Sequence, residues 1–413
     1  MFNVSKEFAP PFGLIAPFFV TGVLFYLVAA IALLFYPTQF SYAQLSVAGW
    51  VHLFLVGYVM MIIFGAMAQL VPVVLETGHF SVDWFYVIFP LLLIGTVGLI
   101  LGFWFDPILL SFGGLLVLVA MVVFAVEVFL TIKKTTLDSL TVRAVKFSNL
   151  FLLLGILSGF LMALALSGFI GVDIEEVLKA HVALVVGGYV MLTIYGITVV
   201  LLPMFGLAHG FDEKPLHQAF WLMVAAVVGE SVGVFFNSLF LEVLFFGAAL
   251  ASAIVYYYQI YLIYKTRVRK ELDIWYRSML AGYAFLALAI LLGIGALLSG
   301  MSQTAIVGAF WALFAFFAFL INGHLYKIVP FLVWFHRFSE LVGKRKVPML
   351  HEMYPKRQAD FHFWFTLAGF TLALVGLLFG NDEIFKAGGS FLVAGAIFLV
   401  TSLRWMLAFK ESV

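Results

Sequence analysis

The chain carries the sequence HLFLVGYVM at residues 52–60, and a second copy of its last four residues, GYVM, lies at 188–191. The two copies are 131 positions apart (57 to 188), and a further step of 127 positions (196 to 323) reaches a third, weaker copy. A glycine and a proline follow at the same spacing each time: Gly65 and Pro72, Gly196 and Pro203, and Gly323 and Pro330. The spacing predicts a threefold internal repeat of about 130 residues, which is room for about four membrane-spanning helices of roughly 20 residues in each copy.

The composition excludes a soluble protein of this length. Of the 413 residues, 65% are hydrophobic and 10% are charged, so polar side chains are too few to cover a folded core. Each apolar segment should be a helix, because hydrocarbon forces backbone groups to pair within their own segment. Twelve segments are long enough to cross a bilayer: 13–36, 49–75, 84–103, 108–132, 147–170, 178–206, 217–238, 241–264, 276–299, 303–334, 361–380 and 384–408.

We therefore predict an all-α membrane protein with twelve transmembrane helices in three pseudo-threefold-related four-helix arcs. The arcs correspond to repeats at about 13–132, 147–264 and 276–408, within a single transmembrane domain that covers residues 1–413. The first apolar segment has no small-residue cleavage site followed by a polar domain. We therefore interpret it as a retained helix and not as a signal peptide.

Lysine and arginine are concentrated on one side of the predicted helices. They cluster at 133–146, 265–277 and 337–357, whereas the opposite connections are mainly acidic and hold only Lys179 and Lys386. By the positive-inside rule the basic connections are cytoplasmic, and so are both termini. The net charge of +1 hides this asymmetry. No basic groove accompanies it, so we expect membrane lipid, and no nucleic acid, as a partner.

The chain has no cysteine. Disulfides, thiolate metal sites and cysteine nucleophiles are therefore excluded. A metal or a haem would have to be held by histidine, methionine, tyrosine or a carboxylate, a set of ligands that suits haem iron and copper better than structural zinc.

Two histidines lie at matching depth near the outer ends of related segments, His52 in 49–75 and His181 in 178–206. An imidazole inside a membrane needs a polar partner, and an axial bond to haem iron supplies one. The alternative is a helix-end histidine bonded to water or to a nearby carbonyl. The 131-residue shift aligns His181 with Trp50, and two residues turn a helical side chain by roughly 200°. We nevertheless predict that both histidines reach one ligand.

Further polar residues lie inside the predicted helices. His324 and Lys327 are about one turn apart, and Glu230 is near the middle of its segment. A buried acid in hydrocarbon is costly and is usually paired, protonated or part of an ion path. We predict His324 as a further metal ligand, with a polar packing contact as the alternative. Glu230 and Lys327 are predicted stations of a proton or ion path, with Asn237 and Asn322 as candidate partners of the acid.

Residues near the predicted cytoplasmic ends have a simpler interpretation. His79, His209 and His336 each follow a repeat proline by six or seven residues, and we interpret them as caps of the helix ends. Glu127 is close in sequence to Lys133 and to the lysine after it. We therefore interpret Glu127 as a surface acid whose side chain extends to water.

His52 is followed by Gly57, by Gly65-Ala66 and by Leu70-Val71-Pro72. This spacing resembles the haem-ligating helix of haem-copper oxidase subunit I and of its nitric oxide reductase relatives. It also resembles the NnrS family of twelve-helix proteins that contain haem and copper. The resemblance covers the whole chain as architecture, but only two of the twelve segments as a motif.

The resemblance implies a cofactor and its ligands. Haem b or copper would bind through His52 and His181, and Tyr58 and Tyr189 would line the haem pocket. An oxygen-reducing centre of that family also needs two histidines on the seventh helix and two on the tenth. Here the only histidine near the seventh segment, His217, is at the opposite membrane face, and the only one in the tenth segment lies below the expected depth.

We therefore predict no oxygen or nitric oxide reductase. The predicted role is in electron transfer, in the response to nitric oxide or metals, or in respiratory haem and metal handling. The expected location is the bacterial inner membrane, with respiratory-chain subunits, cytochromes or a second copy of the chain as partners. Two alternatives stay open: a cofactor-free transporter that uses Glu230, His324 and Lys327, and an accessory subunit of a respiratory complex whose haem sites have become packing contacts.

Overall fold

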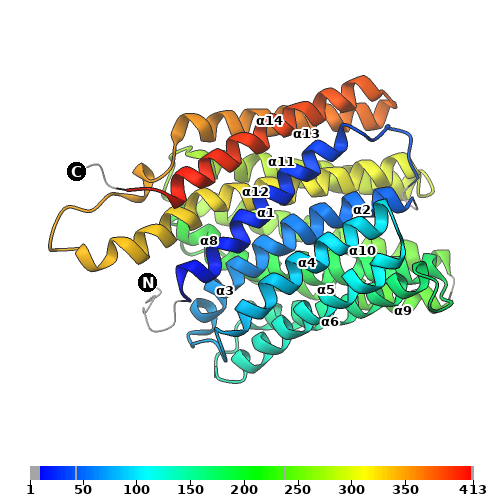
Figure 1. Ribbon diagram of the computed structural model, residues 1–413, viewed down its shortest axis with the longest axis horizontal. Helices are drawn as coiled ribbons and strands as arrows, with labels where there is room; N and C mark the ends of the chain where they lie inside the picture. Colours follow the sequence, from blue (N-terminus) through cyan, green and yellow to red (C-terminus); the bar gives the residue numbers. More distant parts are fainter. Residues whose placement is uncertain (1–9, 42–43, 237, 411–413) are drawn as a thin grey trace. The chain divides into compact units, whose positions relative to one another are not determined.

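The computed structural model describes residues 10–41, 44–236 and 238–410 (Figure 1). Regular secondary structure within these ranges is helical, apart from one isolated bridge between Ala208 and Arg267. Twelve helical stretches of the described chain are long and apolar enough to cross a membrane. The predicted all-α fold with twelve membrane-spanning helices is confirmed, and the chain is a multi-pass membrane protein. Asn237 and the two chain ends lie outside the described residues.

Contacts along the chain define two compact units, each of which is described by itself. Unit 1 comprises the described residues of 66–270 together with Pro10. Within it, α4 packs on α5, α5 on α6 and α9 on α10. Its helices are α3 (Met61–Leu75, which begins in unit 2), α4 (Trp84–Trp104), α5 (Ile108–Ile132), α6 (Leu140–Leu166), α7 (Ile174–Val182), η3 (Ala183–Met191), α8 (Leu192–Gly206), α9 (Lys214–Gly233), η4 (Val234–Phe236) and α10 (Leu239–Thr266).

Unit 2 comprises the described residues of 11–65 and 271–410, so the first and the last helix belong to one body. Figure 1 shows α1, in blue, beside α14, in red, and these helices are in contact. α11 packs on α12 and α13 on α14. The helices are α1 (Phe12–Leu33), α2 (Leu45–His52), η2 (Leu53–Met60), α11 (Ile274–Leu298), α12 (Gln303–Arg337), η5 (Ser339–Leu341), η6 (Leu350–Glu352), α13 (Lys356–Phe379) and α14 (Asp382–Leu407). The single domain of three repeats stays a prediction.

Small residues allow the closest helix contacts in both units. A Cβ atom on Gly113 of α5 would lie 2.4 Å from the backbone nitrogen of Leu99 in α4. A Cβ atom on Gly388 of α14 would lie 2.4 Å from the backbone nitrogen of Ala373 in α13. Membrane helices have no hydrophobic drive to associate, so this close backbone approach is what lets such antiparallel pairs gain packing energy.

Two of the spanning helices change their hydrogen-bond pattern on the way through the membrane. η2 and η3 are π-helical, with bonds between residues five apart instead of four. The 131-residue shift carries η2 onto positions 184–191, which lie within η3. α12, which holds the third glycine and proline pair, is α-helical throughout. Because π-helical turns in α-helices are frequent at functional sites, the residues that flank η2 and η3 are the first candidates for a site.

Candidate functional site

His52 is the last residue of α2, directly before η2. Its Nδ1 atom lies 2.8 Å from the carbonyl oxygen of Ala48, one turn earlier. A carbonyl only accepts hydrogen bonds, so Nδ1 carries the proton and Nε2 carries the lone pair. Metal-binding histidines are usually oriented by this type of bond from the non-ligating nitrogen.

His181 lies in α7, two residues before η3. Its Nδ1 atom is 2.8 Å from the carbonyl oxygen of Gly155 in α6, so this ring has the same tautomer as His52. The imidazole lies against α6, because a Cβ atom on Gly159 would be 2.7 Å from Cε1 of the ring. Both histidines are half-buried. Their Nδ1 atoms bond to carbonyls, as in the alternative interpretation, while the tautomer leaves Nε2 suited to a metal.

His52 belongs to unit 2 and His181 to unit 1, so each is described within its own unit. That they reach one ligand stays a prediction. Among the residues that the structure describes, no group of three or more histidine, aspartate or glutamate side chains is placed to hold a metal ion. A site at either histidine would therefore depend on an imidazole and on a ligand such as haem, which brings its own nitrogen donors.

The two predicted pocket tyrosines, Tyr58 and Tyr189, are fully buried in the π-helical segments. The hydroxyl of Tyr58 donates to Oδ1 of Asn322 at 2.7 Å. At the position aligned with His181, Trp50 stacks on Trp311 with 5.7 Å between ring centroids. Aromatic rings therefore fill unit 2 beside that position. The role of the two tyrosines in a haem pocket stays a prediction.

The predicted polar stations lie in different surroundings. Nζ of Lys327 is 2.6 Å from Oδ2 of Asp273, the N-cap residue of α11. His324 is buried and its Nδ1 atom donates to the carbonyl of Leu320 at 2.7 Å. Glu230 of α9 is part-buried, and it interacts electrostatically with Glu242 and Lys179. Nζ of Lys179 and Oε1 of Glu242 form an ion pair at 2.7 Å.

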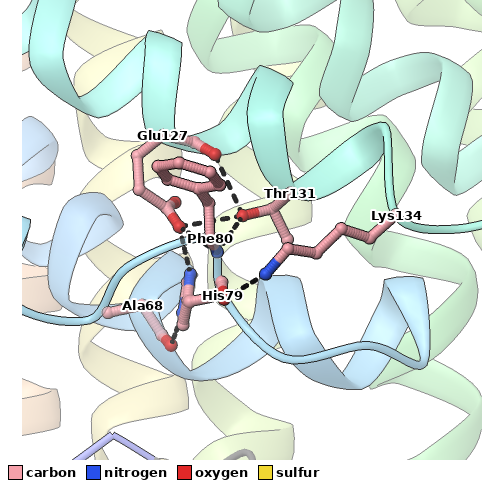
Figure 2. Close-up of polar contacts among 6 residues, drawn as sticks. All are labelled: Ala68, His79, Phe80, Glu127, Thr131 and Lys134. Carbon is pink, nitrogen blue, oxygen red and sulfur yellow. Dashed lines mark hydrogen bonds and ion pairs between the residues drawn. The ribbon is translucent and has the colours of Figure 1, made fainter.

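Two sequence interpretations are wrong at the other polar cluster of unit 1, which Figure 2 shows. The side chain of Glu127 is fully buried and not at the surface, and its Oε1 atom lies 3.0 Å from Nδ1 of His79. His79 is likewise buried, although its Nε2 atom does bond to a carbonyl of α3, that of Ala68, at 2.6 Å. The lysine that suggested a surface position, Lys134, donates from Nζ to the carbonyl oxygen of His79 at 2.7 Å.

The hydrogen bonds of this His79–Glu127 cluster determine its charge. The carbonyl of Ala68 only accepts, so Nε2 of His79 is protonated. Oε1 of Glu127 already accepts from the Phe80 amide at 3.0 Å and from the Thr131 hydroxyl at 2.8 Å, so it is an acceptor and takes a third hydrogen bond from Nδ1–H of His79. The imidazole is therefore doubly protonated, and Glu127 balances its charge inside an apolar surrounding.

A second buried cluster, in unit 2, is a chain of four polar side chains from η2, α12 and α13. Tyr58 donates to Oδ1 of Asn322, whose Nδ2 atom lies 3.3 Å from Nε2 of His362. Nδ1 of His362 lies 3.3 Å from the hydroxyl of Tyr326. All four residues are at most 2% exposed. We call this the Tyr58–His362 chain. No sequence motif singles out His362, because its partners are 36 and 40 positions away.

Comparison with protein-family models and with curated proteins finds no match for this chain. The resemblance to haem-copper oxidase subunit I and to the NnrS family therefore rests on the residues of 52–72 and 181–203.

Proposed function

We propose that the protein lies in the bacterial inner membrane with both termini cytoplasmic, and that it binds haem b or copper through His52 and His181. The basic connections on one side support the orientation. The observation that carries the cofactor proposal is that the two imidazoles, each within its own unit, have the same local geometry. His52 directly precedes one π-helical segment and His181 lies two residues before the other. Each donates Nδ1–H to a backbone carbonyl, so that Nε2 would be the ligand nitrogen.

The bound group would supply one-electron chemistry that the side chains lack. The chain's own part is to hold the ligand nitrogens in place and to keep water away from them. The carbonyls of Ala48 and Gly155 fix the two rings. Electron transfer, a response to nitric oxide or metals, and respiratory haem or metal handling are the roles that suit such a protein, with respiratory-chain subunits or cytochromes as partners. A homodimer is compatible with these roles.

The test is a reduced minus oxidised absorption spectrum of the purified protein, with iron and copper measured on the same sample. We expect a b-type band or bound copper in the unmodified protein. His52→Ala and His181→Ala should each lower the bound cofactor. Gly159→Ala should push the His181 ring away from α6 and weaken binding by about tenfold. His351→Ala, which changes an exposed histidine, is the matched control. Unchanged cofactor in both alanine variants would refute the proposal.

A cofactor-free transporter is the second candidate, and Glu230 favours it. One carboxylate oxygen of Glu230 is buried and has no hydrogen-bond partner among the described residues, beside the pair formed by Lys179 and Glu242. Such a carboxylate is suited to bind a cation or a proton within a membrane. A colourless protein that gains thermal stability with a substrate would support this candidate.

A further inference from the structure

Three further buried hydroxyl groups lie beside the Tyr58–His362 chain. The hydroxyl groups of Tyr26 in α1 and Thr366 in α13 lie near Asn322, and that of Ser402 in α14 lies near Tyr326. The hydroxyl oxygens of these three residues are buried and have no hydrogen-bond partner among the residues that the structure describes. Buried polar groups of this kind are normally satisfied by ordered water, which needs two to four polar partners.

The hydrogen bonds of the chain can point in either direction. In one direction Tyr58 donates to Oδ1 of Asn322, Nδ2 of Asn322 donates to Nε2 of His362, and Nδ1–H of His362 donates to the hydroxyl oxygen of Tyr326. If the Asn322 amide turns over, every donor becomes an acceptor. Both directions satisfy all four side chains, because amides, phenols and neutral imidazoles each offer donors and acceptors.

The Tyr326 end of the chain leads toward the predicted cytoplasmic face. The ring of Tyr326 lies 6.0 Å from the ring of Tyr354, in the connection before α13. Burial raises the pKa of Tyr354 above its ordinary value, so this phenol keeps its proton. Tyr326 also interacts electrostatically with Asp360, which forms an ion pair with Arg277 and is about half exposed. The Tyr326 end of the buried chain therefore lies within electrostatic range of a charged, water-accessible group.

We propose that the Tyr58–His362 chain is a hydrated proton-relay site, which moves a proton between the Asp360 side of unit 2 and the buried water position beside Tyr26 and Thr366. This inference is independent of the haem or copper proposed above. The ligands of the site are water and a proton. The site ends at Tyr58, so it is a path into the membrane and not a path across it.

One transfer conserves all atoms and charges. An excess proton carried by water beside Tyr26 and Thr366, as a hydronium ion, binds to Nε2 of His362 and leaves a neutral water molecule. The imidazole then releases its Nδ1 proton to the hydroxyl oxygen of Tyr326. Tyr326 gives its own hydroxyl proton to water beside Ser402. One proton has moved, each side chain is neutral again, and His362 is left as the other tautomer. The turned Asn322 amide then accepts from Nε2–H, and the reverse sequence restores the first tautomer.

The experiment is nitrogen-15 magnetic resonance of the full-length protein with labelled histidines, because ring-nitrogen shifts distinguish the two tautomers. His362→Gln assigns the signal of interest among the nine histidines. We expect His362 to populate both tautomers and to exchange its ring proton with heavy water. His324 is the internal control: it is buried in the same unit, and its Nδ1 atom bonds to a carbonyl, which cannot reverse.

Tyr326→Phe removes one reversible partner and keeps the ring, so it should shift the tautomer ratio of His362 by about fivefold. If the Tyr326→Phe protein does not fold, the same tautomer ratio is measured in Tyr58→Phe, which changes the other end of the chain. A single tautomer of His362 that exchanges as slowly as His324, or a ratio that neither phenylalanine variant changes, would overturn the proposal.

Discussion

The His79–Glu127 cluster and the Tyr58–His362 chain each bury a histidine with both ring nitrogens bonded, yet the two imidazoles differ in charge. His79 lies between a carbonyl and a carboxylate oxygen, which only accept hydrogen bonds. His362 lies between an amide and a phenol, which both donate and accept. Burial is therefore not what determines the charge of a membrane histidine. The chemistry of its two partners does, and it also decides whether the ring is fixed or free to change tautomer.

The largest effect should come from removing one charge of the His79–Glu127 cluster. Glu127→Leu leaves an imidazolium in an apolar surrounding, and we expect the free energy of unfolding to fall by about 3–5 kcal/mol. Unfolding of the detergent-solubilised protein by heat or denaturant measures the change. The double variant His79→Leu with Glu127→Leu should be less destabilised than either single variant. Simple additivity of the two effects would show that the side chains do not form an ion pair.

A smaller effect is expected in the neutral chain. Asn322→Leu leaves the hydroxyl of Tyr58 and Nε2 of His362 without their partner, but it isolates no charge. We expect a loss of about 1–3 kcal/mol in the free energy of unfolding, measured in the same way. A loss as large as that of Glu127→Leu would contradict the assignment of a neutral ring to His362.

The smallest effect should come from an ion pair in water. The exposed side chains of Asp138 and Arg143 are joined by two hydrogen bonds that Arg143 donates. These bonds hold the pKa of Asp138 below its ordinary value. Such a pair stabilises the fold above the ordinary carboxyl pKa, and the contribution is lost as the pH falls through the lowered value. The melting temperature of Asp138→Asn should differ slightly from that of the unmodified protein at pH 7, and the difference should shrink as the pH falls below the ordinary carboxyl pKa. A difference that grows in acid would contradict this sign.

The fold follows from the sequence more completely than the sites do. Twelve apolar segments must be helices whatever they pack against, so the distribution of apolar residues along the chain determines the number of helices. The histidine partners depend on tertiary contacts. The partner of His52 is four residues away, but that of His181 is on another helix. Glu127 and His79 are 48 positions apart. Only one contact of this cluster is visible in the local sequence: Glu127 and Thr131 are four positions apart and therefore lie on the same face of α5.

The π-helical segments also determine the direction in which the two histidine side chains point. Each such segment contains a residue more than an α-helix would use for the same turn. Deleting one residue from η3 would return it to α-helical geometry and swing His181 by about 100° around the helix axis relative to Gly196. The same holds for His52 relative to Gly65 and a deletion in η2. The direction of each imidazole thus depends on the number of residues in the π-helical segment as much as on which residues these are.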